Sequence, residues 1–232
     1  MMNRLNKEQK LGEVVAMFPG AARIFNKEGI DYCCHGDRTL ESALLEKEIE
    51  VIGFLNEINK SYDEFLNSKE AYIDWRKEDP NKLIDNIVDT HHAFTYRELI
   101  EIDQLLLKIL KVHYHHSGEE LKTVHKLFGA LKTELEEHLI KEEEELFPMI
   151  KEYFKNPSEE LRDSIMKFVG VIENEHTGAG HILQDLYRET NGYKTPEGAC
   201  TTFNLVYKKL DALEKDLFIH IHKENSILFK II

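Results

Sequence analysis

Several features are scarce or missing in this sequence of 232 residues. It has no apolar run of about 18 residues, the length that a membrane-spanning helix needs, and no secretory signal pattern. Its three cysteines, two of them adjacent, are too few for a disulfide framework. We therefore expect a soluble cytoplasmic protein with reduced thiols.

Positive charge and strand-forming patterns are also scarce. The chain has 30 Lys and Arg residues against 43 Asp and Glu residues, a formal net charge of −13, and the acids are spread along its length. This balance argues against nucleic acid or an anionic membrane as a partner. Alternating runs rich in Val and Ile are missing, and there are only five prolines. The expected fold class is therefore all-α.

The predicted helices divide the chain into a short-helix part and a long-helix part. Residues 1–66 contain short amphipathic segments separated by turn signals, and they predict a small helical N-terminal domain. Residues 67–81 predict a linker, near whose end Asp79-Pro80 marks a helix boundary. Residues 82–232 form the long-helix part.

Four long amphipathic helices are expected in that second part. A 3.6-residue apolar period places them at about 81–114, 118–154, 158–190 and 198–231. The connections are short except for the last one. Four such helices with short loops predict an antiparallel four-helix bundle.

One sequence phrase occurs twice in this bundle. Residues 134–150 (ELEEHLIKEEEELFPMI) match residues 216–232 (DLFIHIHKENSILFKII) at seven of 17 positions, with an offset of 82 residues. Both copies hold a His and a Glu four residues apart, a spacing that puts the two side chains on one helical face. These pairs are His138 with Glu142 and His220 with Glu224. The offset relates the second helix to the fourth. We therefore expect two similar hairpins, one of the first and second helices and one of the third and fourth.

The first and third helices should then each supply a His at a related position. His176 continues the apolar stripe of the third helix, four residues after Ile172. His92, which lies 84 residues earlier, continues the stripe of the first helix four residues after Val88. The neighbouring His91 fits that stripe almost as well, so periodicity alone leaves both residues open.

The expected inward-facing set contains four imidazoles and two carboxylates. Its members are His92, His138, Glu142, His176, His220 and Glu224. Buried carboxylates need cations or protons, and two metal ions, each with two His and both sharing the two Glu, would meet that need. These ligand types suit iron, manganese or zinc, and metals bridged by carboxylates in a bundle are typical of di-iron proteins. The alternative is that the His-Glu pairs lie on exposed helix faces.

Two further acids and two glycines lie close to these positions in the sequence. Glu134 is one turn before the His of the first copy, and Glu175 directly precedes His176. Each acid is either a solvated carboxylate or one that orients a ligand His or relays protons. Gly178 and Gly180 follow. They either only weaken the helix or, being small, leave a path for a small molecule, and the path is favoured.

The cysteines allow more than one interpretation. Cys33 and Cys34 are adjacent, and a disulfide between them would close a strained ring. They are either incidental thiols in a short loop or a reactive or metal-contacting pair, with His35 near enough to favour the thiolate. Cys200 is expected to be a small buried residue.

The chain resembles the repair-of-iron-centres family, di-iron proteins that repair iron–sulfur clusters and carry a hemerythrin-like domain. The resemblance extends from end to end, and the adjacent cysteines match that family's small N-terminal domain. The segments that carry it are DYCC at 31–34, DW at 74–75, KLIDNIV at 82–88, HH at 91–92, KVH at 111–113, the stretch 134–150, ENEH at 173–176, TPEGACTTF at 195–203 and DLFIHIHKEN at 216–225.

The resemblance implies a centre of two non-haem iron ions with an oxo bridge and two bridging glutamates. Carried over by position, its ligands are His92, His138, Glu142, His176, His220 and Glu224. It favours His92 over His91, and it matches Glu134 and Glu175 with acids near the centre of relatives.

Three positions depart from the family pattern. Relatives often have a second His at the position of Thr95, a Pro at the position of Lys230, and a Gly at the position of His35. None of the three is an expected ligand. What Thr95 and His35 do to reactivity stays open.

Three functions are compatible with such a centre. The first is repair, in which labile iron passes to damaged iron–sulfur cluster proteins that dock on residues 1–66. The second is a nitric oxide reductase that forms nitrous oxide, with Glu134 or Glu175 supplying protons. The least favoured is a carrier or sensor of dioxygen, because hemerythrin has a ligand set richer in His. Expected partners are damaged cluster proteins and nitric oxide, dioxygen or peroxide, and the protein is expected to be a monomer or homodimer.

Overall fold

The computed structural model describes residues 4–68 and 72–232, and its regular structure in these residues is helical. The only pairing of strand type recorded for them is an isolated bridge between Lys10 and Thr39. None of the described helices is long and apolar enough to cross a membrane. The all-α class predicted from the sequence is confirmed.

The chain forms two compact units. One contains residues up to Leu83 together with Phe218–Ile232, and the other is Ile84–Leu217. The last long helix, α9 (Thr201–Ser226), therefore contributes to both. The domain boundaries expected from the sequence, with a bundle that continues to the C-terminus, stay a prediction.

Four helices make up most of the first unit. They are α1 (Leu11–Met17), α2 (Gly20–Glu28), α3 (Leu40–Glu46) and α4 (Val51–Ser68). The side chain of Thr39 caps α3 by accepting a hydrogen bond from the backbone N–H of Ser42, as its position predicts. Gly29 ends α2 with a φ of 64°, a left-handed conformation that glycine adopts without strain.

The core of this unit is a single apolar cluster. Phe25, Leu40, Leu44 and Ile58 are fully buried in it, and Ile221 of α9 belongs to the same cluster. Burying a side chain of this size contributes about 1.5–3 kcal/mol. The last turns of α9 are thus part of the folded N-terminal unit.

The predicted linker at 67–81 is described only in part, because residues 69–71 lie outside the described residues. A short 3-10 helix, Trp75–Lys77, follows them, and the side chain of Asp74 caps it. Helix α5 (Pro80–Asn86) then begins at the proline that marks the predicted boundary.

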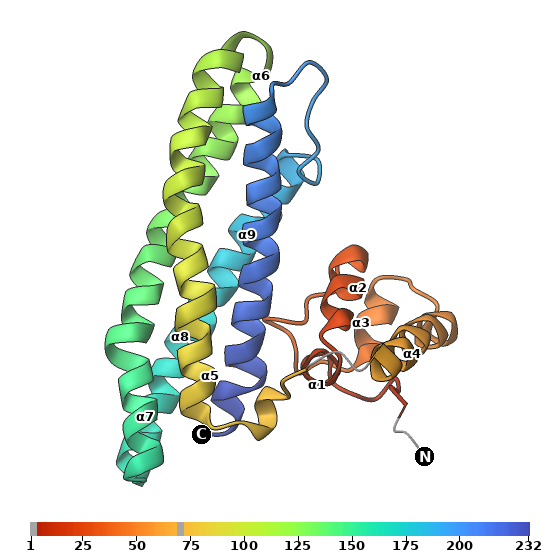
Figure 1. Cartoon of the computed structure of the whole chain (residues 1–232), viewed down its shortest axis with the longest axis vertical. Coiled ribbons are helices and arrows are strands. Elements are labelled where there is room, and N and C mark those ends of the chain that lie inside the picture. Colours follow the sequence, from red (N-terminus) through yellow and green to blue (C-terminus); the bar gives the residue numbers. More distant parts are fainter. Residues whose placement is uncertain (1–3, 69–71) are drawn as a thin grey trace. The chain divides into compact units, whose positions relative to one another are not determined.

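The second unit contains the long helices. After α5 come α6 (Ala93–Lys141), α7 (Phe147–Lys155) and α8 (Glu159–Glu189), followed by α9. Helix α6 contains most of the first two predicted helices. A kink at Ser117, where φ is −129° and ψ is 21°, divides it into two arms. Figure 1 shows the chain reversing direction there, with the two arms of α6, α8 and α9 side by side. The predicted antiparallel four-helix bundle is confirmed.

Apolar stripes from the long helices meet inside the bundle. Leu99 and Ile102 from one arm of α6, Leu131 from the other and Ile172 from α8 are all fully buried. Ser158 caps α8, accepting a hydrogen bond from the backbone N–H of Leu161. The 3.6-residue period predicted these inward faces, and the same faces continue into the polar cluster described next.

Candidate metal centre

Two of the predicted ligands lie in widened turns of their helices. Ile87–His92 and Glu142–Leu146 are π-helical, so each segment accommodates one extra residue in its turn. Such insertions are frequent at functional sites. The sequence predicted uninterrupted α-helices here, and periodicity carries no signal for a single inserted residue.

All six predicted ligands are buried. The exposed fraction is 0% for both Glu142 and Glu224, and 1%, 4%, 2% and 1% for His92, His138, His176 and His220. The alternative interpretation, in which the two His-Glu pairs lie on exposed helix faces, is therefore wrong.

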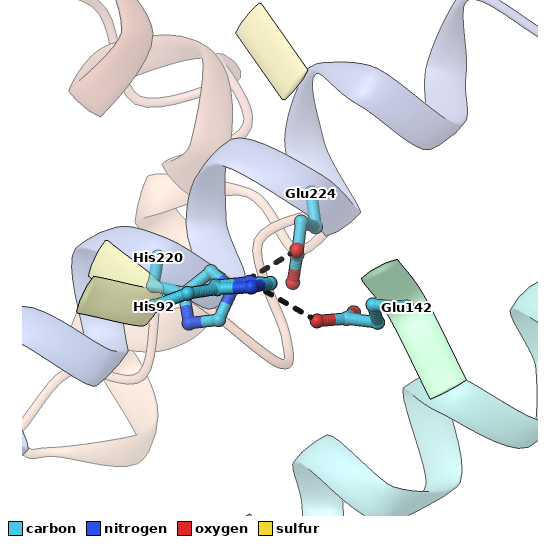
Figure 2. Close-up of side chains that lie close together, drawn as sticks. All are labelled: His92, Glu142, His220 and Glu224. Carbon is cyan, nitrogen blue, oxygen red and sulfur yellow. Dashed lines mark hydrogen bonds and ion pairs between the residues drawn. The ribbon is translucent and has the colours of Figure 1, made fainter. Parts of the chain in front are cut away.

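The six side chains form two groups that overlap in their carboxylates. His92, Glu142, His220 and Glu224 have ligand atoms that all lie within 4.8 Å of one another. The same holds for His138, Glu142, His176 and Glu224. Each group thus has two imidazoles of its own, and both groups contain both glutamates. Figure 2 shows the first group, with its side chains directed toward one another.

Glu142 faces both groups through different oxygen atoms. Its Oε2 lies 3.3 Å from His92 Nε2, while its Oε1 lies 3.4 Å from His138 Nε2 and 4.0 Å from His176 Nε2. On α9, Glu224 Oε1 lies 2.9 Å from His220 Nε2, one turn away. This is the arrangement that a bridging carboxylate requires.

Two further carboxylates hold the outer nitrogen atoms of the histidines. His92 Nδ1 lies 2.8 Å from Glu143 Oε1, and His138 Nδ1 lies 2.9 Å from Glu175 Oε2. An Nδ1–H donated to a carboxylate leaves the Nε2 lone pair directed at the centre and makes it more basic. The sequence did not identify Glu143, because its position beside Glu142 looked like part of a solvated acidic face.

The two acids singled out in the sequence lie in different surroundings. Glu175 also accepts a hydrogen bond from Lys141 Nζ at 2.7 Å, and its bonds with His138 and Lys141 lower its pKa to about 2. It is ionised at neutral pH and orients His138. Glu134 is exposed, and its Oε2 would lie 3.8 Å from a Cβ atom built on Gly178. A role for Glu134 stays a prediction.

His91 occupies a different place from His92. Its ring is buried, and its Nδ1 lies 3.0 Å from Asp216 Oδ1. It belongs to neither four-residue group, whereas His92 belongs to one. Asp216 is the acid that aligns with Glu134 in the repeated phrase, so the repeat marked its position but not its contact.

The adjacent cysteines form a third, separate cluster with Asp31. The ligand atoms of Asp31, Cys33 and Cys34 lie within 4.8 Å of one another, and the two Sγ atoms are 3.8 Å apart. The hydrogen bond with Cys34, burial and the charge of Asp31 raise the pKa of Cys33 well above its ordinary value. His35 Nδ1 instead pairs with Asp31 Oδ2 at 2.6 Å. The expectation that His35 favours a thiolate at Cys33 is therefore wrong.

Cys200 also differs from expectation. It is only partly buried, and a hydrogen bond with His113 followed by the backbone N–H of Phe203 lowers its pKa to about 7. The prediction of a buried apolar Cys200 is therefore wrong. The sequence did not reveal its contact with His113, because the two positions are far apart along the chain.

The donor set fits a pair of divalent cations. Two fully buried carboxylates bring negative charge into the bundle core, where isolated charge is strongly disfavoured. Neutral imidazole nitrogens and carboxylate oxygens suit iron among the common metals, and neither group contains a thiolate.

Comparison with known proteins agrees with this geometry. Residues 7–62 match a family described as ScdA_N, a domain of unknown function, and residues 83–232 match the hemerythrin HHE cation binding domain. The iron–sulfur cluster repair protein YtfE of Escherichia coli O157:H7 is 34% identical over 225 residues, which cover 96% of each chain. The YtfE protein of Enterobacter sp. (strain 638) is 33% identical over the same length and coverage. The chain therefore belongs to the repair-of-iron-centres family of iron–sulfur cluster repair proteins with a hemerythrin-like domain.

Proposed function

We propose that this chain is a di-iron protein that repairs iron–sulfur clusters damaged by nitrosative or oxidative stress, and that it acts as an iron donor. The observation that carries the proposal is the overlap of the two buried groups in Glu142 and Glu224. Two ions that share both carboxylates, with two imidazoles each, account for every side chain in the cluster.

Each side chain then has a defined role. His92 and His220 would hold one iron ion, His138 and His176 would hold the other, and Glu142 and Glu224 would offer carboxylate oxygen atoms to both. When bound, the pair supplies redox chemistry and exchangeable iron. Each group would offer its ion four protein ligand atoms, none of them a thiolate.

The surrounding acids would assist release by stabilising the emptied histidines. A proton at His138 Nε2 would compete with a metal ion for that nitrogen, and Glu175 at Nδ1 would stabilise the imidazolium. Glu143 does the same for His92. Iron retention should therefore weaken in mild acid.

The recipients in this proposal are damaged iron–sulfur cluster proteins, and the relatives' names support that class of partner. The helices of residues 11–68 offer a surface for docking them. Nitric oxide, dioxygen or peroxide would reach the centre as small molecules. We place the protein in the cytoplasm, as a monomer or homodimer, and three cysteines that form no disulfide with one another support a reducing compartment.

Nitric oxide reduction at the same site is the competing function. It needs proton donors beside the metal, and Glu175, with a pKa of about 2, is ionised at neutral pH. Glu134 is exposed, and among the described residues no contact between it and a predicted ligand is recorded. The surroundings of these two acids therefore favour donation over nitric oxide reduction.

Iron transfer and nitric oxide consumption, measured side by side, test the proposal. Iron-loaded protein is mixed anaerobically with an apo-ferredoxin, sulfide and reductant, and cluster formation is followed by absorbance. We expect transfer by the wild type and by Glu144→Ala, which changes an exposed neighbour, but not by Glu142→Ala. Rapid catalytic loss of nitric oxide with the iron retained would instead support the reductase.

A further inference from the structure

Two faces of the last turns of α9 make different contacts. His220 and Glu224 lie on the face that belongs to the metal centre. Phe218, His222 and Asn225 recur at helical spacing on another face. That face meets residues 31–36, which contain both adjacent cysteines and are called the thiol loop below.

A buried hydrogen bond joins the thiol loop to α9. The side-chain amide of Asn225 donates from Nδ2 to the backbone carbonyl of Cys33 at 3.1 Å. The ring of Tyr32, which is fully buried, packs edge-on against His222 and Phe218, with centroids 5.9 Å and 6.5 Å away. These contacts bracket the two iron ligands of α9 in the sequence.

The approach of the loop to the end of α9 leaves no spare room. A Cβ atom on Gly36 would lie 2.7 Å from Ser226 Oγ and 2.6 Å from the carbonyl oxygen of Tyr32. Gly12, whose N–H donates to the Gly36 carbonyl at 2.8 Å, would collide with the same serine if it had a side chain. Because the packing is this close, the loop cannot rearrange without moving the helix end.

The thiols are built into the bonds that shape this loop. Asp31 Oδ1 accepts hydrogen bonds from Cys33 N–H at 3.1 Å, Cys34 N–H at 3.0 Å and Cys33 Sγ–H at 3.2 Å. A group that bonds to both sulfur atoms removes the thiol hydrogen bond and draws the Sγ atoms together from 3.8 Å. Such a group must therefore distort the loop.

We propose that the thiol loop positions the α9 ligands and that a soft, thiol-bridging ligand bound to Cys33 and Cys34 speeds the loss of iron from His220 and Glu224. Asn225 is the positioning residue that links the two. The inference rests on the proposed function, since it names a control on the release of the same iron.

A trivalent aryl arsenoxide is a suitable probe. It condenses with both thiols, so that two As–S bonds form while the arsenic–oxygen bond breaks, and the oxygen leaves as water with the two thiol protons. Neither arsenic nor sulfur changes oxidation state. Mass spectrometry of the intact chain reports the binding directly.

The first readout is the rate at which a ferrous chelator removes iron from the loaded full-length protein. We expect the arsenoxide to raise this rate about fivefold, the rate equivalent of one lost hydrogen bond. Cys200→Ser should respond like the wild type, and the double variant Cys33→Ser/Cys34→Ser should not respond. Asn225→Asp, which keeps the size but loses the donor, should raise the rate without the probe and respond less to it.

The second readout needs no iron. Trp75 is the only tryptophan, and Lys223 Nζ, between the two faces, lies 5.4 Å from its ring centroid. Arsenoxide binding to metal-free wild type should shift Trp75 fluorescence, and Asn225→Asp should reduce that shift. Probe bound with neither fluorescence nor iron release changed would overturn the inference. A fluorescence shift in a protein that binds no iron would instead support the coupling and reject the di-iron proposal.

Discussion

The two copies of the repeated phrase, residues 134–150 and 216–232, present the same groups to the centre but are supported differently. In the first copy, His138 is oriented by Glu175, which is itself paired with Lys141 near the surface. In the second, the helix turns around His220 are packed against the thiol loop. The first is held by charge and the second by close packing.

The ends of the two copies differ as well. The first continues through the π-helical segment Glu142–Leu146 into α7, whereas α9 ends at Ser226 and is followed by the short 3-10 helix Leu228–Lys230. A repeated sequence therefore specifies what faces the metal. The surrounding elements specify how firmly each ligand is held.

The largest effect is expected at the two glutamates, one from each copy, that belong to both groups of ligands. Glu142→Ala and Glu224→Ala should each abolish tight iron binding at both positions, because each glutamate belongs to both groups. Iron content after anaerobic loading, with exposed Glu144→Ala as the control, checks this. A variant that retains half of its iron would show that its glutamate does not bridge.

Substitution of a histidine should affect the metal position of one copy and leave the other position intact. His138→Ala and His220→Ala each remove a ligand from one group only, so each variant should retain about half of the iron of the wild type. His181→Ala, on the exposed side of α8, serves as the control. Complete loss from either histidine variant would mean that the two positions fill only together.

Stability against pH should depend on Glu214, which lies two residues before the second copy. Burial first, and then the charge of Asp211, raise the pKa of Glu214 from 4.5 to about 7, with Tyr193 and Lys215 also nearby. The folded state thus binds this proton more tightly than the unfolded state, and the stabilisation present below about pH 4.5 is lost as the pH rises through about 7.

Glu214→Gln should remove that loss and stabilise the metal-free protein by about 2 kcal/mol at pH 8, with little effect at pH 4. The residue at the same position before the first copy is Lys132, and Lys132→Gln should leave this pH slope unchanged. Urea unfolding at several pH values measures both. An unaltered slope in Glu214→Gln would contradict the assignment.

The smallest effect is expected at Glu175. Glu175→Gln weakens the acceptor that orients His138, so iron affinity should fall about tenfold. Glu137→Gln is the matched control, since Glu137 also pairs with Lys141, at 2.9 Å, but does not contact a ligand. Competition with a ferrous chelator gives both affinities. Equal values for the two variants would remove Glu175 from the site.

Much of the fold was predictable because it rests on periodicity. The 3.6-residue stripes identified the bundle, and the repeated His-Glu spacing identified residues that the structure gathers around Glu142 and Glu224. Local signals such as Thr39 and Pro80 placed helix starts correctly. These features depend on neighbours within a few turns.

The missed features depend on contacts that spacing does not encode. The π-helical segments change the side-chain register within one turn, and this brings Glu143 to His92 although an ideal helix places it on a solvated face. Asp216 and Cys200 acquire their partners, His91 and His113, from distant parts of the chain. Tertiary packing alone decides such pairs.

Anaerobic titration of ferrous iron into the metal-free wild type tests the central claim most directly. The shared carboxylates predict tight binding of about two iron ions per chain. A single tightly bound ion, or none, would contradict the di-iron centre.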